Sequence, residues 1–199
     1  MQFWFLGNRH LFEPSSRIDQ TALLSFSDLA EAYIVQTLRR VYHFPIPLLR
    51  QSLLRLKQAT GSDHPLLGHD IRIIGKRLIL ASGQGPKRRM LDLTHGLGTQ
   101  SAIPAVVDAV GRRITFDKAR MPRQLFPWRH LGDDQESRPV SVDPEVMSGR
   151  LVVSGTRIPV FFLAGMRREG RSIQFIADDY GLPLQTVRQA LEHLDTKAA

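Results

Sequence analysis

Apolar side chains recur at helical spacing in two segments near the start of the chain. In the first segment these side chains are Leu29, Tyr33, Ile34, Leu38 and Val41. Either Ser25 or Ser27 can cap it at the N-terminus. Two prolines then interrupt the pattern, since proline cannot continue a helix, and a second amphipathic segment follows. The pattern therefore predicts two consecutive helices, at about 28–43 and 47–59.

Two short, mainly aliphatic runs, Ile71-Arg-Ile-Ile74 and Leu78-Ile-Leu80, flank the sequence Gly75-Lys76-Arg77. This spacing predicts a β-hairpin with a basic turn. Two helices followed by a hairpin is the order of a winged helical module, whose wing often lies on the DNA backbone. We therefore expect Lys76 and Arg77 to contact phosphates. The alternative is a turn whose charges only keep the protein soluble.

The stretch 83–99 is rich in glycine and contains proline, so we expect it to be a loop. It carries three consecutive basic residues, Lys87, Arg88 and Arg89. A loop with this charge is a further candidate for contact with DNA phosphates. The same residues also fit a solvated basic turn without a partner.

The remaining pattern is clearest in the last third of the chain. The elements expected after the loop are a helix near 103–110, a strand at 113–116, a polar linker at 130–138, strands at 140–142 and 151–153, and helices at 160–169, 173–180 and 184–194. Gly170 and Gly181 end the first two of these last helices. A short helix, a glycine turn and a longer helix make a helix-turn-helix layout.

In that layout the early residues of the second helix enter the major groove. The residues on or near its outward face are Gln185, Thr186, Arg188 and Gln189. Gln and Arg can bind base edges with two hydrogen bonds, and Arg157 and Arg171 are candidates for phosphate contact. The alternative is a three-helix module that only dimerises or binds protein, with these side chains in solvent.

The sequence Gly155-Thr156-Arg157 precedes the helix that Pro159 is expected to open. We interpret these residues as structural rather than functional. Gly155 can adopt positive φ, Thr156 can cap the helix, and Arg157 can pair with a carboxylate such as that of Asp179.

The charge balance narrows the choice of partner. The 199 residues are 42% hydrophobic and 23% charged, as in ordinary globular proteins. Lys and Arg number 27 against 19 Asp and Glu, a net charge of +8. This excess favours nucleic acid or an acidic protein as a partner. The alternative is a basic but otherwise inert surface.

Composition also bears on the cellular compartment. The chain contains no cysteine, which excludes disulfides and thiolate chemistry and fits a reducing compartment. The N-terminus lacks the apolar core of a secretory signal, and no apolar run is long enough to span a membrane. We therefore expect a cytoplasmic protein that does not interact with membranes.

The sequence shows no group of residues with the spacing expected of a catalytic site. Asp178 and Asp179 are neighbours on a predicted helix and point about 100° apart, which is poor geometry for an acid/base pair. His64 and His69 have no third metal ligand at suitable spacing. Residues 83–87 lack the G-K-[ST] ending of a phosphate-binding loop. We predict that the protein is not an enzyme and needs no cofactor or metal.

Residues 142–194 resemble the family called domain of unknown function 433. The matching positions are Asp143-Pro144, Gly149-Arg150, Gly155 to Pro159, Gly170, Ser172, Ile176-Ala177, Asp179-Tyr180 and Leu182. Leu151 stands where the family usually has proline. The length and order of the motif make this resemblance specific.

Residues 24–70 are similar to the middle of two-domain VapB-type antitoxins, through LSFSDLAEA and the segments PIPLLRQSLLRLK and HPLLGHDI. In those proteins a MerR-like DNA-binding module precedes the same C-terminal domain. Its first helix-turn-helix lies upstream of this stretch, where only about two dozen residues are present. Residues 3–7 resemble the end of its recognition helix, and we expect the module to be truncated here.

The resemblance implies an α+β and mainly helical protein. Residues 1–129 would form a winged, MerR-like module with a β-hairpin, 130–138 a linker, and 139–199 a three-helix helix-turn-helix domain. Small helix-turn-helix proteins bind two DNA half-sites through two-fold symmetry, which implies a homodimer. The implied partners are a PIN-like ribonuclease toxin, which the antitoxin neutralises, and double-stranded operator DNA, through which the pair represses its operon.

Two points remain open at this level. Phe126, Trp128 and Arg129 are expected to be exposed beside the linker and are candidates for toxin contact, although Trp128 can equally pack in the core. The competing function is a stand-alone transcription regulator without a toxin, and a third hypothesis is a protein-interaction module that never touches DNA.

Overall fold

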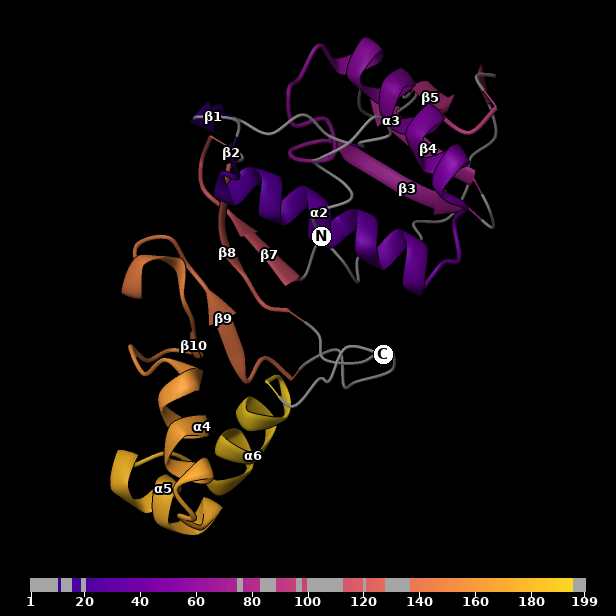
Figure 1. Ribbon diagram of the computed structural model, residues 1–199. Helices are drawn as coiled ribbons and strands as arrows, with labels where there is room; N and C mark the ends of the chain where they lie inside the picture. The colour runs from indigo at the N-terminus through magenta and orange to yellow at the C-terminus, as the bar shows by residue number, and fades with distance from the viewer. Residues whose placement is uncertain are drawn as a thin grey trace. The chain divides into compact units, whose positions relative to one another are not determined.

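The computed structural model describes residues 11, 16–18, 21–74, 77–82, 89–95, 98–99, 113–119, 121–127 and 137–194. Within them the chain forms five α-helices and ten β-strands (Figure 1). The chain divides into two compact units. The first is Met1–Arg112 with Phe116–Pro122, and the second is Arg113–Thr115 with Arg123–Ala199. Each unit has its own hydrophobic core.

Helices α2 (Phe26–Arg40) and α3 (Ile46–Thr60) confirm the two helices expected from apolar spacing. A reciprocal capping box starts α2: the Asp28 N–H donates to Ser25 Oγ at 3.1 Å, and the Ser25 N–H donates to the Asp28 carboxylate at 2.7 Å. Gly61, at φ +65°, ends α3. The first helix therefore begins two residues earlier than expected, because Ser25 rather than Ser27 is its cap.

The first unit contains a four-stranded antiparallel sheet. Its strands, in spatial order, are β3 (Asp70–Ile74), β4 (Arg77–Ser82), β5 (Arg89–Asp92) and β6 (Gly98–Thr99). The predicted hairpin is confirmed as β3 and β4, but β5 and β6 extend it, so it is not a free wing. Strands β1 (Ser16–Ile18) and β2 (Thr21–Leu23) form a separate pair.

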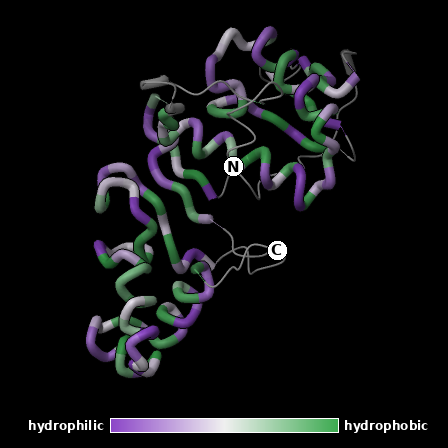
Figure 2. The backbone as a smooth tube through the Cα atoms, viewed as in Figure 1, coloured by the Kyte–Doolittle hydropathy of each residue, from purple (hydrophilic) through white to green (hydrophobic). Residues whose placement is uncertain are grey.

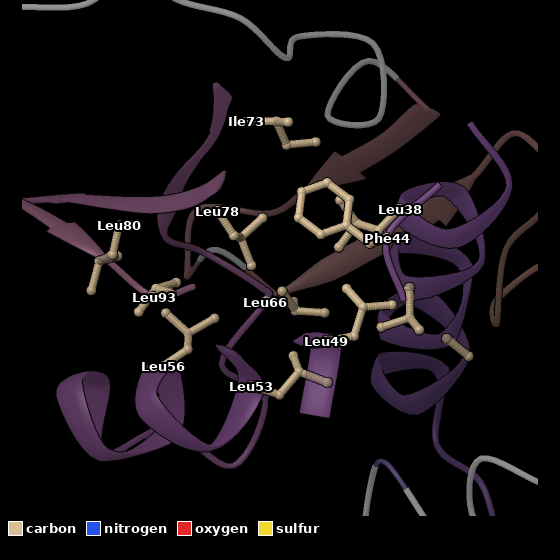
Figure 3. Packing of buried hydrophobic residues seen from close by; sticks show 12 residues of the cluster. Leu38, Phe44, Leu49, Leu53, Leu56, Leu66, Ile73, Leu78, Leu80 and Leu93 are labelled. Atoms are coloured by element: carbon tan, nitrogen blue, oxygen red, sulfur yellow. The ribbon is translucent and has the colours of Figure 1, made fainter. Parts of the chain in front are cut away.

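The helices and the sheet of this unit meet in a leucine-rich core. Figure 3 shows Leu49, Leu53 and Leu56 of α3 in one cluster with Leu78 and Leu80 of β4. Burying each such side chain contributes about 1.5–3 kcal/mol. The burial of these leucines therefore supplies much of the free energy that keeps α3 packed on the sheet.

A buried carboxylate joins α2 to the segment that follows α3. The Glu31 side chain is 1% exposed. Its Oε1 accepts the Leu66 N–H at 2.8 Å, and its Oε2 lies 3.2 Å from His64 Nδ1. Burial raises the pKa of Glu31, while the hydrogen bond from Leu66 and the neighbouring His64 oppose that rise. His64 is thus a hydrogen-bonding neighbour of a structural carboxylate.

Another four-stranded antiparallel sheet belongs to the second unit, apart from the strand-end residues Phe116 and Pro122. Its strands are β7 (Ile114–Phe116), β8 (Pro122–Leu125), β9 (Val140–Val142) and β10 (Leu151–Val153), in the spatial order β10-β9-β8-β7. A single turn of 3-10 helix, Met147–Gly149, joins the last two. The three strands expected at 113–116, 140–142 and 151–153 are confirmed, whereas β8 was not expected.

Helices α4 (Val160–Arg168), α5 (Ile173–Tyr180) and α6 (Leu184–Glu192) follow that sheet. Their buried side chains form one cluster with Val140 and Val153 of the strands. The helical members are Val160, Leu163, Ile176, Ala177, Val187, Ala190 and Leu191. Figure 2 shows hydrophobic and hydrophilic residues mixed along these helices, as expected for helices with one buried face.

The expectation of a mainly helical protein is wrong. Each unit combines helices with an antiparallel sheet, and the described residues hold twice as many strands as helices. Two of the missed strands, β5 (RMLD) and β8 (PRQL), are four residues long and show no clean alternation of apolar and polar positions. Their pairing partners decide their conformation, which a local pattern does not reveal.

The compact units also differ from the domains expected at 1–129 and 139–199. Strands β7 and β8 belong to the same sheet as β9 and β10, so the second unit begins well before the expected linker. The helix expected at 103–110 lies outside the described residues, as do residues 130–136 of the linker. None of the described helices is long and apolar enough to cross a membrane.

The role of Glu31 predicts a specific stability pattern. Glu31→Ala leaves the buried Leu66 N–H without an acceptor and should cost about 1–3 kcal/mol in urea unfolding. Glu31→Gln retains an acceptor and should stay within about 1 kcal/mol of the parent. Equal stability of the Ala and Gln variants would contradict this role.

The raised pKa of Glu31 adds a pH dependence. Above the ordinary pKa of 4.5 the folded state holds this proton more tightly than the unfolded state. The free energy of unfolding should therefore decrease as pH rises from 4.5 through the raised pKa. This contribution to the slope should disappear in Glu31→Gln, and urea titrations at several pH values measure it.

Candidate functional site

The turn between α5 and α6 sets the orientation of α6. Ser172 Oγ accepts the Phe175 N–H at 3.0 Å and caps the start of α5. Gly181 ends α5 at φ +62°, and the Leu182 N–H then donates to Ala177 O at 2.9 Å. This hydrogen bond closes the C-terminal end of α5, and α6 begins three residues after Gly181, at Leu184.

Burial on one side of α6 decides which of its polar residues are accessible. Val187, Ala190 and Leu191 are in the core. Gln185 and Arg188, three positions apart and hence on one face, are exposed. Thr186 is half-buried. Of the four residues predicted to contact base edges, Gln185 and Arg188 are therefore the most accessible.

Gln189 is also half-buried and is partly engaged within its own unit. Its Oε1 accepts a hydrogen bond from Ser137 Oγ at 3.4 Å. The side chain thus links α6 to the segment before β9. This contact favours a positioning role for Gln189 over direct contact with a base.

Arg171 and Arg157, the predicted phosphate contacts of this unit, are both exposed. The Arg171 guanidinium lies over the Phe175 ring, 5.0 Å from its centroid. Among the ion pairs of the described residues, none joins Arg157 to Asp179, so the expected pair is not formed. Both arginines thus present their charge at the surface.

Thr156 has a structural role that differs from the expected one. Its hydroxyl donates to Val153 O at 2.9 Å and accepts the Ile158 N–H at 3.0 Å. It therefore closes the turn before α4, while the cap of α4 is Pro159, which makes no side-chain hydrogen bond. Gly155 adopts φ +75° in this turn, as expected.

The two described basic residues predicted in the first unit, Arg77 and Arg89, do not lie side by side. Arg77 begins β4 and Arg89 begins β5; both are exposed. Arg89 pairs with Ser82 at the opposite end of β4 from Arg77, about 17 Å away at strand spacing. Arg77 Nε also lies 3.9 Å from the buried Asp92 carboxylate. Lys76, Lys87 and Arg88 lie outside the described residues.

The expected exposure of Phe126 is wrong. Its side chain is 8% exposed, and the Arg138 guanidinium covers the ring at 4.8 Å from the centroid. Phe126 directly follows β8, and its ring packs inward because β8 is part of a sheet. The sequence did not predict β8 as a strand and therefore did not predict this burial. Trp128 and Arg129 lie outside the described residues, so the proposed contact of this segment with a toxin stays a prediction.

A groove lies between α4, α5 and α6, with a volume of about 590 Å³. It is lined by Ala164, Arg167, Arg168, Ile173, Arg188, Leu191, Glu192 and Leu194. Three of these eight residues are arginines. Arg167 and Arg168 were not singled out from sequence, although two consecutive arginines in the last turn of a helix are a recognisable signal.

The described residues provide no metal-binding cluster of three or more His, Cys, Asp or Glu side chains. Their buried carboxylates are engaged in holding the backbone. Asp92 Oδ1 accepts the N–H groups of Thr94 and His95, as Glu31 accepts that of Leu66. The arrangement of the second unit favours binding, through an exposed helix face and a basic groove.

Comparison with known proteins agrees with the resemblances. Residues 140–193 match the family model described as "Protein of unknown function (DUF433)". The chain is 27% identical over 179 residues to "Putative antitoxin VapB45" of Mycobacterium tuberculosis, covering 86% of this chain and 71% of that protein. Both resemblances, to the family and to VapB-type antitoxins, are thereby confirmed.

The fold is also similar to a solved structure. The crystal structure of Rv2018 from Mycobacterium tuberculosis matches with a TM-score of 0.61 and 22% sequence identity. The match covers 92% of this chain and 86% of that one. At 22% identity, this similarity is evidence for a shared fold alone.

The turn before α6 gives a paired prediction. Gly181→Ala places a side chain at positive φ and should destabilise the protein by about 1–2 kcal/mol. Gly165→Ala, within α4 and with nothing within 4 Å of the added Cβ, should instead stabilise it by about 0.5–1 kcal/mol. Chemical denaturation of both variants checks this, and the same sign for the two substitutions would contradict it.

Proposed function

We propose that this protein is the antitoxin of a type II toxin–antitoxin pair. It binds and neutralises a PIN-like ribonuclease toxin and, as a homodimer in the cytoplasm, represses its own operon through DNA. The observation that carries the proposal is the similarity to "Putative antitoxin VapB45", which extends over 86% of the chain. The match of residues 140–193 to the DUF433 family adds to it.

Physical features of the chain support a binding role. The net charge of +8 favours an acidic protein or nucleic acid as the partner. Phe161 and Phe162 on α4 are both exposed and stack on each other, with ring centroids 4.5 Å apart. An exposed aromatic pair beside cationic residues is typical of protein interfaces, in which aromatic residues and Arg are enriched. We propose that the protein has no catalytic activity of its own.

DNA contact is proposed for the exposed face of α6. Gln185 and Arg188 lie there together, and their side chains can form paired hydrogen bonds with adenine and guanine respectively. Arg157 and Arg171 are exposed in the same unit and suit phosphates. The stand-alone regulator shares this surface and differs from the antitoxin only in lacking a toxin.

The toxin partnership predicts a stable complex. Coexpression of the tagged full chain with the product of the adjacent reading frame, which we propose to be the PIN-like toxin, should yield a copurified complex, because neutralisation requires direct binding. The same coexpression should relieve the growth arrest that the toxin causes alone. A harmless neighbour, or elution of the protein alone, would leave the stand-alone regulator as the better hypothesis.

The DNA hypothesis predicts a base-specific loss. In fluorescence anisotropy with DNA from upstream of the operon, Gln185→Ala should weaken binding by about 1–3 kcal/mol, or roughly 5- to 150-fold. Binding to unrelated DNA should change little, since that binding rests on phosphates. Gln51→Ala, at an exposed position on α3, is the control. An equal loss on both DNAs would refute base contact by Gln185.

A further inference from the structure

The groove of the second unit combines an apolar floor with a rim of three arginines and one carboxylate, that of Glu192. Ala164, Ile173 and Leu191 are half-buried or buried, and Leu194 is 42% exposed at one end. Arg167, Arg168 and Arg188 are all exposed. A ligand in this groove would therefore contact apolar side chains at the floor and a net positive charge at the edges, because three arginines outnumber the single carboxylate of Glu192.

The arginines at the rim are partly oriented by backbone carbonyls, and no carboxylate of the described residues neutralises them. Arg167 Nη1 donates to Arg171 O at 2.8 Å, and Arg168 Nε donates to Ala164 O at 3.3 Å. Both acceptors are uncharged backbone carbonyls. Within the described residues no carboxylate pairs with Arg167, Arg168 or Arg188. Each guanidinium retains donors in the fork geometry that fits a carboxylate with two hydrogen bonds.

These features favour a protein segment over the other ligands. A small molecule is normally enclosed over most of its surface, whereas four of the eight lining side chains here are exposed. DNA phosphates would satisfy the arginines but would gain nothing from the apolar floor. A second copy of this chain, with 27 basic against 19 acidic side chains, offers this arginine-lined groove more positive than negative charge, so we assign the proposed homodimer contact to another surface.

We propose that the groove between α4, α5 and α6 is the docking site for an acidic, amphipathic segment of the toxin. Apolar side chains of that segment would lie on Ile173, Leu191 and Leu194. Its carboxylates would pair with Arg167 and Arg168. This inference rests on the proposed antitoxin function and locates the surface that carries it.

The test is a binding measurement between the full chain and the toxin of the adjacent reading frame, by biolayer interferometry. The double variant Arg167→Glu/Arg168→Glu should weaken binding at least about tenfold, because it turns two attractive contacts repulsive. Arg39→Glu/Arg40→Glu is the matched control, since these are also consecutive exposed arginines in the last turn of a helix. It should bind as the parent does.

A second variant tests the apolar floor separately. Leu194→Asp alters an exposed residue and should not disturb folding, yet it should also weaken toxin binding severalfold. Circular dichroism spectra and thermal melts confirm that each variant is folded.

Each outcome has a distinct meaning. If the parent chain does not bind the toxin, the proposed function itself fails. If the parent binds and both groove variants bind equally well, the function stands and the groove assignment is overturned. If the groove variants keep the parent's affinity for the toxin but lose operator DNA binding, the groove is a DNA site and the assignment is overturned. If they keep that affinity but lose self-association, the groove binds a second copy of this chain, which also overturns the assignment.

Discussion

Helix α6 buries Val187, Ala190 and Leu191 against the core of its unit, and this one-sided burial decides which side chains of the helix are accessible to partners. A helix of nine residues is too short to persist alone in water. Its rotation about its own axis is therefore set by packing. That rotation brings Gln185 and Arg188 to the surface and makes α6 one wall of the basic groove.

In the first unit, the residues that resemble VapB-type antitoxins have structural tasks. Ser25 and Asp28 form the capping box of α2, and Glu31 holds the backbone at Leu66. A buried donor or acceptor without a partner costs about 1–3 kcal/mol. The polar positions of this stretch are thus explained by the backbone groups they satisfy, and they need no direct contact with DNA or toxin.

The described basic residues are spread over both units. Arg77 and Arg89 stand at opposite ends of one strand pair, while Arg167, Arg168 and Arg188 converge on one groove. Net charge alone does not distinguish these arrangements. Convergence matters because a ligand can engage several charges at once only where they lie within its reach. The groove therefore indicates where a partner binds more specifically than the overall excess of positive charge does.

The sequence by itself determined the five described helices and the first hairpin, because apolar periodicity, capping residues and glycine stops act within a few positions of one another. The resemblance of the C-terminal segment to the DUF433 family was also visible in the order of its residues. The sequence did not reveal β5, β6 and β8, the burial of Phe126, or the position of Arg167 and Arg188 in one groove. These depend on strand pairing and helix packing between residues far apart in the chain. Only the tertiary structure brings such residues together, because neither pairing nor packing leaves a local pattern.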